Sequence, residues 1–331
     1  MKQSWWRKCL KFVVRVGSAV ALFILAVWFI LSQPTFASQS PATVTADAAK
    51  LRAHVEKLAV EFHPRNYEQM DNLNRCADYI AQHFKDAGGR VTEQTLDVNG
   101  RIYRNVSAFF GPKTGARWIV GAHYDSCEDT PGADDNASGV AGLLELARML
   151  GSNPPSYAVE LVTWPLEEPP FFSTSNMGSA RHAESLDQAK HPVRGMIALE
   201  MIGYYRDDFG SQDYPSPMLT AIYPNTGNFL AVIGNWEQRD FVQQVKTGMK
   251  GATDLPIESI AAPPTIPGID FSDHRNYWPL GIPAVMVTDT AFYRNPHYHE
   301  LTDTPDTLDY DRMAKAVTAV YSALGNVPLS D

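Results

Sequence analysis

The sequence predicts an α/β fold in which helices pack against a largely parallel central sheet. Short apolar segments alternate along the chain with longer segments whose apolar residues recur at helical spacing. This alternation is typical of sheets covered by helices. Several of the short segments are also followed by histidine or acidic residues, which would then share one edge of the sheet.

Residues 1–37 are predicted to direct export. Five bases and no acid precede residue 16, and Val16–Leu31 is apolar without any charge. Cleavage after Ala37 would make the segment a signal peptide. Its tryptophans, and an apolar run close to the roughly 18–20 residues that cross a bilayer, would make it an uncleaved anchor in the plasma (inner) membrane. Either outcome places the rest of the chain in the periplasm or the extracellular space.

The remainder is predicted to be a short linker followed by one domain. Residues 38–46 are rich in Ser, Ala, Thr and Pro, as linkers are, and residues 47–331 form the predicted domain. With 44% hydrophobic residues in 331, the chain can bury a large core. Its net charge of −9, with a basic leader, leaves an acidic body, which argues against nucleic acid as a partner. The sequence predicts no particular oligomeric state.

The elements of the domain follow from capping, periodicity and turn residues. A helix capped by Asp47 is predicted first, followed by a second helix over 70–87. Strands at 91–98 and 102–109 flank Asn99-Gly100, a strong hairpin signal. The remaining predicted elements are strands at 116–122, 157–164, 193–199, 219–223, 229–233 and 284–288, and helices at 138–150, 178–186, 237–249 and 310–324.

The stretch from Ile119 to Gly139 carries the first candidate site residues. Its strand ends on His123 and Asp125, and Asp134-Asp135-Asn136 stands at the start of the next helix. Imidazole and carboxylate are zinc ligands, and an aspartate near a ligating histidine can accept the second ring N–H. The competing interpretation is structural, with Asp135 or Asn136 capping the helix and His123 an ordinary buried histidine.

Further acids and histidines follow later strands. Glu167-Glu168 lies between apolar segments, although a pair of adjacent glutamates can also be a solvated turn. Glu200 is a lone acid in an apolar run and needs a cation partner. His297 and His299 lie in the loop before the last helix, where surface histidines are common. Cys127 could pair with Cys76 or ligate a metal, but no CxxC motif supports a cysteine site.

Taken in order, these motifs resemble the co-catalytic dizinc exopeptidases, which include bacterial leucine aminopeptidases, glutamate carboxypeptidase and glutaminyl cyclases. The resemblance covers residues 75–325 and implies a three-layer α/β/α sandwich on a mixed, mostly parallel sheet. Its motifs are His123-Tyr-Asp-Ser126, Gly132-Ala-Asp-Asp-Asn-Ala-Ser-Gly139, Glu167-Glu168, Leu199-Glu-Met201, Ser272-Asp-His274 and Tyr298-His299 before Asp303-Thr304.

The resemblance implies five ligands for two Zn²⁺ ions. Asp135 would bridge the ions, because it stands four positions before Gly139 as the bridging aspartate of the family does. His123 and Glu200 would hold one ion, and Glu168 and His299 the other. A glutamate at position 200 departs from the aspartate usual in the aminopeptidases.

It also implies roles for three residues that do not bind metal. Glu167 would be the general base for an attacking water, Asp125 would orient His123, and Tyr298 would donate to the oxyanion. Asp273 and His274 are expected to be structural.

The implied activity is that of a zinc exopeptidase, most specifically an aminopeptidase acting on peptides with a free N-terminus. Arg275 and Arg294, in loops flanking the site, leave a carboxypeptidase open. The resemblance is also compatible with a single-zinc glutaminyl-peptide cyclotransferase and with a non-catalytic receptor or scaffold homologue. An insertion at Pro169–Met177 is expected to shape the substrate pocket.

Overall fold

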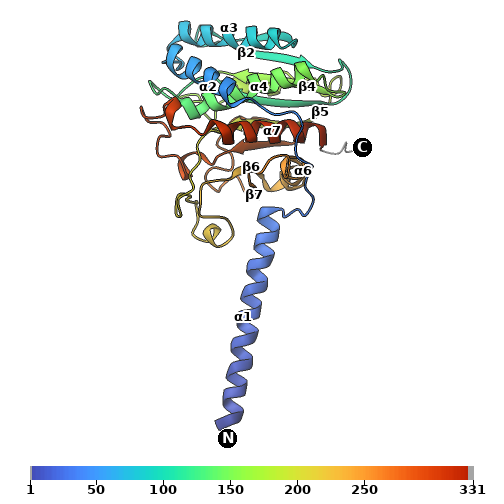
Figure 1. Cartoon of the computed structure of the whole chain (residues 1–331), viewed down its shortest axis with the longest axis vertical. Helices are drawn as coiled ribbons and strands as arrows, with labels where there is room; N and C mark the ends of the chain where they lie inside the picture. Colours follow the sequence, from blue (N-terminus) through green and yellow to red (C-terminus); the bar gives the residue numbers. More distant parts are fainter. Residues whose placement is uncertain (1, 327–331) are drawn as a thin grey trace.

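The computed structural model describes residues 2–326; Met1 and residues 327–331, at the ends of the predicted leader and domain, lie outside the described residues. A long helix projects from a compact body (Figure 1). The helices are α1 (Lys2–Ser32), α2 (Ala48–Glu56), α3 (Met70–Asp86), α4 (Gly139–Ser152), α5 (Gly178–Glu184), α6 (Arg239–Met249) and α7 (Tyr310–Asn326). The strands are β1 (Arg90–Val98), β2 (Arg101–Phe110), β3 (Arg117–His123), β4 (Ala158–Trp164), β5 (Val193–Glu200), β6 (Leu230–Asn235), β7 (Ile257–Ala262) and β8 (Ala284–Thr288).

The strands form a mixed sheet in the order β1-β2-β4-β3-β5-β8-β6-β7. The central strands β4, β3, β5 and β8 are parallel, and β6 pairs with β7 in parallel as well. The pairs β1–β2, β2–β4 and β6–β8 are antiparallel. The carboxyl ends of the four central strands therefore meet at one edge.

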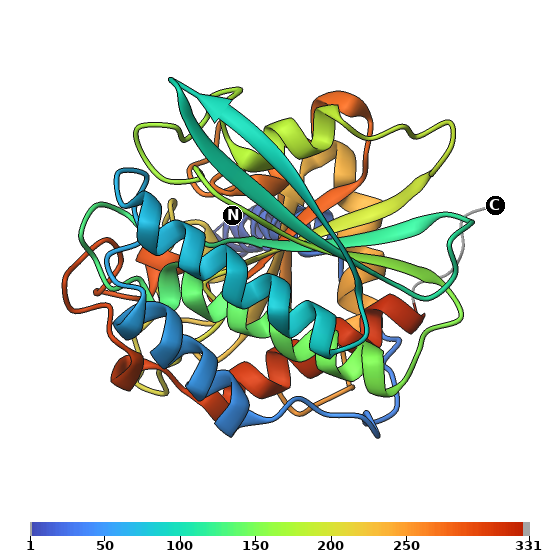
Figure 2. The same cartoon turned by 90° about the horizontal axis from the view of Figure 1, so that it is seen from above.

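Helices cover both faces of this sheet. Alternate residues of β3 illustrate the division: Val120 belongs to the buried cluster that also contains residues of α2, α3, α4, α6 and α7, whereas Ile119 belongs to a separate cluster that contains Ala183 of α5. Figure 2 shows α3, α4 and α7 on one side of the twisted sheet and α5 on the other. The predicted three-layer α/β/α sandwich is confirmed.

Local sequence signals explain where several elements begin and end. Asp47 caps α2 by accepting from the backbone N–H groups of Ala49 and Lys50. Asn99 and Gly100 have φ values of 54° and 77°, as the tight hairpin between β1 and β2 requires. Gly88, with a φ of 84°, follows α3.

In the second half of the domain, one predicted strand is wrong and one observed strand was not predicted. Residues 219–223 are not a strand, because only a 3-10 turn (Leu219–Ala221) forms between Pro217 and Pro224, whose rings limit strand pairing. The edge strand β7 was not predicted, since Glu258 and Ser259 interrupt its apolar pattern. Cys76 and Cys127 are free thiols, so the disulfide considered for them is not formed.

Gly121 provides a stability prediction on the strand that leads to His123. A Cβ at Gly121 would lie 1.9 Å from Cη2 of Trp164, whose side chain is fully buried. Gly121→Ala is therefore expected to destabilise the body by about 3 kcal/mol, the upper end of typical overpacking costs. Gly142→Ala in α4 is the control, since its Cβ would meet only side-chain tips at 3.0–3.3 Å. Thermal unfolding of both variants tests this, and equal melting temperatures would contradict it.

Candidate metal centre

The sheet edge collects the predicted site residues from distant parts of the chain. His123 and Glu200 are the last residues of the neighbouring strands β3 and β5. Glu167-Glu168 follows β4, and Asp135 lies in the short helical segment Ala133–Ser138 that leads into α4. His299 comes from the loop between β8 and α7. The parallel topology brings these side chains together because each follows the carboxyl end of a strand.

Two imidazoles lie on either side of one carboxylate. Nε2 of His123 is 3.4 Å from Oδ1 of Asp135, and Nε2 of His299 is 3.2 Å from Oδ2 of the same residue. Nε2 of His123 is also 3.4 Å from Oε2 of Glu200. Nε2 of His299 is 3.3 Å from Oε2 of Glu168. The five residues predicted as ligands thus form two adjacent groups that share Asp135.

Asp125 contacts His123 of the first group through the ring nitrogen that faces away from Asp135. Its Oδ1 lies 3.4 Å from Nδ1 of His123, on the side of the ring opposite Asp135. The same carboxylate accepts from the backbone N–H groups of Glu167 at 3.3 Å and Glu168 at 3.1 Å. One buried aspartate therefore positions both an imidazole and the two-glutamate turn.

Further hydrogen bonds hold the carboxylates and their backbone in place. They involve two residues that lie in the sequence motifs but were given no role there. Asp303 accepts from the backbone N–H groups of Asp134 and Asp135 at 2.9 and 3.1 Å. The Oγ of Ser272 donates to Oε2 of Glu200 at 2.8 Å. Asp303 and Ser272 both lie in motifs that carry the family resemblance, and this was the sequence signal that could have identified their roles.

Neighbouring residues of the same chemical type point elsewhere. The carboxylate of Asp134 accepts from the Gly203 N–H at 2.9 Å and from Nδ2 of Asn295 at 2.8 Å. Nδ1 of His297 lies 2.8 Å from the Thr302 hydroxyl. Neither residue has its side chain in the two groups around Asp135.

The concentration of buried acids favours a bound cation. Burial raises the pKa of Glu168 to about 8, and it also raises the pKa of Glu167 well above its usual range. Burial likewise disfavours the charged form of Asp135, but hydrogen bonding to His123 and His299 outweighs it and lowers the pKa of Asp135. Oε1 of Glu168 has no hydrogen-bond partner among residues 2–326. Such a nitrogen and oxygen donor set, with more acid than base, fits divalent zinc.

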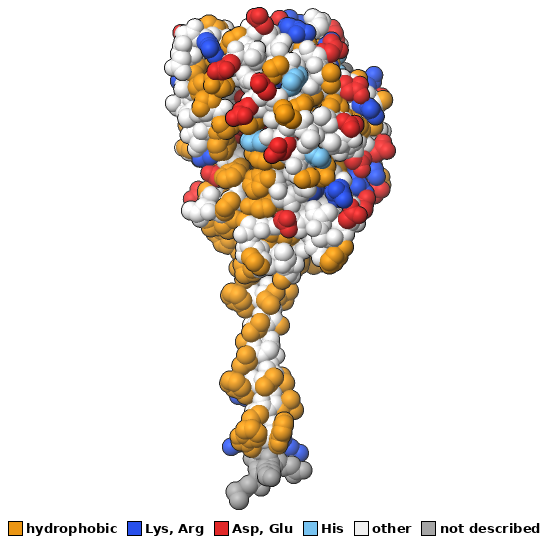
Figure 3. Space-filling view, turned by 90° about the vertical axis from the view of Figure 1, so that its left-hand side faces the viewer, with side chains coloured by type: hydrophobic (Ala, Val, Ile, Leu, Met, Phe, Trp, Pro, Cys, Tyr) orange, Lys and Arg blue, Asp and Glu red, His pale blue; other side chains and the backbone are white. Residues whose placement is uncertain are grey.

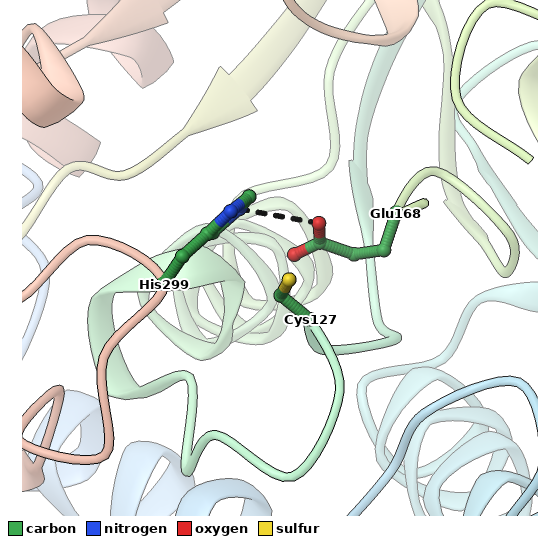
Figure 4. Close-up of side chains that lie close together, drawn as sticks. All are labelled: Cys127, Glu168 and His299. Carbon is green, nitrogen blue, oxygen red and sulfur yellow. Dashed lines mark ion pairs between the residues drawn. The ribbon is translucent and has the colours of Figure 1, made fainter. Parts of the chain in front are cut away.

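Cys127 lies beside the second group. A ligand atom of each of Cys127, Glu168 and His299 falls within 4.8 Å of the others. Figure 4 shows the thiol next to the Glu168 carboxylate, across from the His299 ring. Burial raises the pKa of the thiol, which favours its neutral form.

An apolar cavity of about 280 Å³ adjoins the two groups. Tyr298 lies at its boundary, with its ring stacked on His299 at a centroid distance of 3.8 Å. Pro169 and Phe172 of the insertion also line the cavity. Its other apolar lining residues include Leu219, Tyr223, Phe229, Ile260, Ile266, Phe271, Met286 and Phe292.

Neither of the two arginines that flank the site in the sequence is among the residues that line the cavity. Arg275 pairs with Asp270 at 3.2 Å. Arg294 is buried, lies 4.6 Å from the centroid of the Phe229 ring and donates to Gln212. Among residues 2–326, the cavity lining contains no Arg or Lys.

The fold is one that solved structures of a leucine aminopeptidase precursor, a Zn-dependent exopeptidase and a glutaminyl cyclase share. The chain belongs to Peptidase family M28, whose sequence model matches residues 105–324.

Relatives and solved structures agree with this assignment. The chain is 47% identical to the uncharacterized protein YfbL of Escherichia coli, over 93% of this chain and 97% of that protein. It is 25% identical to leucine aminopeptidase 1 of Fusarium vanettenii, over 85% and 71% of the two chains. Two Bacteroides thetaiotaomicron structures share the fold at 19% identity and a TM-score of 0.65. One is a glutaminyl cyclase bound to N-acetylhistamine, and the match covers 87% of this chain and 99% of that chain. The other is a leucine aminopeptidase precursor, and the match covers 86% of this chain and 99% of that chain.

Proposed function

We propose that this protein is a zinc-dependent aminopeptidase that releases N-terminal residues with bulky apolar side chains. One observation carries the proposal: Asp135 lies between His123 and His299 at the edge of an apolar cavity that Glu167 also lines. The family assignment supplies the peptidase chemistry, and the cavity supplies the preference for a side chain.

The five donors would hold two zinc ions. His123 and Glu200 would serve one ion, Glu168 and His299 the other, and Asp135 both, since each of its oxygens faces a different imidazole. When bound, the ions would polarise the scissile carbonyl and lower the pKa of the attacking water.

Glu167 is the residue we assign to proton transfer. Its Oε2 lies 4.0 Å from Nε2 of His123, and the residue lines the cavity. In the ionised form it accepts a proton from water as the carbonyl carbon is attacked, and it returns that proton to the leaving amine. The Tyr298 hydroxyl is assigned to the carbonyl oxygen, and Asp125 keeps both His123 and the backbone of Glu167 in position.

The charges around the cavity favour an aminopeptidase over a carboxypeptidase. A free substrate carboxylate needs Arg or Lys, and the lining contains neither among residues 2–326. A protonated amino terminus needs acidic or carbonyl acceptors, and the lining contains Asp213 in addition to the acids assigned to the metal ions and to proton transfer.

A substrate panel tests the proposed activity. The zinc-loaded full chain in detergent is expected to hydrolyse leucyl and phenylalanyl anilides, with kcat/KM at least about 10-fold above the alanyl anilide, because one to a few methylenes in an apolar pocket are worth about that much. N-acetyl-leucyl anilide should remain uncut. Removal of zinc with a chelator should abolish turnover, and zinc should restore it.

The same panel contains the outcomes that would contradict the proposal. Formation of pyroglutamate from glutaminyl peptides, without anilide cleavage, would identify a cyclase. Cleavage of N-terminally blocked peptides from the carboxyl end would identify a carboxypeptidase. Absence of both metal and activity in a folded protein would identify a non-catalytic homologue.

A further inference from the structure

The segment that follows the apolar part of α1 is packed into the body. We call Leu31–Gln39 the stem. Ser32 and Gln33 of the stem are only 2% and 7% exposed. Leu31 packs against the buried cluster formed by β6, β7 and β8 on one face of the sheet. The long helix therefore joins the body without a free linker (Figure 1).

Hydrogen bonds connect the first half of the stem to α6 and β7. The carbonyl of Ser32 accepts from Nζ of Lys246 at 3.0 Å and from the Ser259 hydroxyl at 2.6 Å. The carbonyl of Thr35 accepts from Nζ of Lys250 at 2.8 Å. These contacts satisfy polar groups on two different elements of the body.

The second half of the stem continues along α6. The hydroxyls of Thr35 and Thr247 are 3.2 Å apart. The N–H of Gln39 donates to the Lys250 carbonyl at 2.7 Å, and its side chain donates to the Thr247 carbonyl at 3.1 Å. A signal-peptide cut after Ala37 would fall inside this contact region.

Lys246 makes the stem important for the body itself. Its side chain is 7% exposed, and its described polar partners are the Ser32 carbonyl and Oε2 of Glu258, which is 3.9 Å away. Loss of residues 1–37 would remove the Ser32 carbonyl, which is the nearest described acceptor of the Lys246 ammonium, and would uncover the parts of α6 and β7 that the stem contacts. In the structure, the stem is therefore part of the packing of the body.

The contact region is also next to the cavity. Ser259, which donates to Ser32, and Glu258, the partner of Lys246, both line the cavity. The candidate membrane span in α1, Trp5–Ser32, is 28 residues long, but its first part carries four of the five bases. The stretch from Phe12 to Ile30 has Arg15 as its one charge, and at about 1.5 Å per residue its length comes close to the ~30 Å core of a bilayer. Figure 3 shows hydrophobic side chains on the lower part of the body, towards the helix.

We propose that α1 is retained as an uncleaved membrane anchor, and that the stem is a structural part of the body. The stem then fixes the cavity close to the outer face of the membrane that α1 spans. The five bases before residue 16 keep the amino terminus on the cytoplasmic side, so the body lies outside. The proposal concerns whether the leader is cleaved and how the stem packs on the body, and it does not depend on the activity of the site.

The first experiment determines the mature amino terminus. The full chain with a carboxyl-terminal tag is expressed in a bacterium, and its intact mass is measured in membrane and soluble fractions. A chain that retains the stem and α1 and stays in the membrane pellet after an alkaline carbonate wash is expected. A mature chain that begins at Ser38, recovered in the soluble fraction, would overturn the proposal.

The second experiment tests whether the stem is seated as described. Thr35→Cys with Thr247→Cys, in a Cys9→Ser background, places two thiols where the hydroxyls are 3.2 Å apart. Mild oxidation is expected to join the two peptides in a non-reducing peptide map. Thr35→Cys with Thr92→Cys is the control, because Thr92 is exposed on β1, at the opposite edge of the sheet from β7. Equal crosslinking in both pairs, or none in the first, would show that the stem is not docked.

Discussion

Glu167→Gln is expected to keep both zinc ions and to lose turnover by about 10³-fold, within the range for general acid–base catalysis. The amide occupies nearly the same space, so the turn held by Asp125 through the backbone N–H of Glu167 should remain intact. An amide cannot accept the proton from water, however, so attack on the carbonyl slows. The effect should fall on kcat, while KM for the leucyl anilide changes little.

The measurement combines steady-state kinetics with zinc content by mass spectrometry. Glu300→Gln is the matched control, because Glu300 is an exposed acid adjacent to His299 and its change removes the same charge. Turnover near that of the unmodified protein for Glu167→Gln would show that another group is the base. Loss of zinc in this variant would instead make Glu167 a ligand.

Asp135→Asn is expected to have the largest effect on metal content. Because one oxygen of Asp135 faces His123 and the other faces His299, a change at this residue alters both groups at once. An amide offers one weakly donating oxygen and no negative charge, which leaves each ion with two ligands from the chain. Zinc content is expected to fall from two ions to less than one per chain, with turnover reduced by at least about 10³-fold.

Asp134→Asn is the matched control for this variant. It makes the same substitution one residue earlier, at a carboxylate that accepts from Gly203 and Asn295 and faces away from the imidazoles. The control should retain two ions even if its stability changes. Should Asp135→Asn also bind two ions with unchanged affinity, the shared-carboxylate arrangement would be wrong.

The sequence predicted most of the fold because its local signals agree with the tertiary packing. The Asn99-Gly100 turn, the Asp47 cap and the mostly apolar strands β3, β4 and β5 each have a local physical cause. The edge strand β7 was not predicted, because several of its residues contact the stem or line the cavity. The order of polar and apolar residues in β7 follows those contacts.

The candidate site was predicted by motif order more than by chemistry. Spacing alone could not separate His299 from His297, since both lie in one polar loop two residues apart. In the structure, the ring of His299 faces Asp135 and Glu168, whereas His297 contacts Thr302. The family resemblance selected His299, and its role as a ligand stays a prediction.

Local sequence was enough to predict most of the strands and helices, and the set of acids and imidazoles at strand ends, because each depends on residues close together in the chain. Three features required the folded chain. Asp135 lies between the imidazoles of His123 and His299, the cavity lining contains no Arg or Lys among residues 2–326, and the stem packs on α6 and β7. These are contacts between distant segments. Their distances are set by how the sheet and its helices pack, which no local pattern encodes.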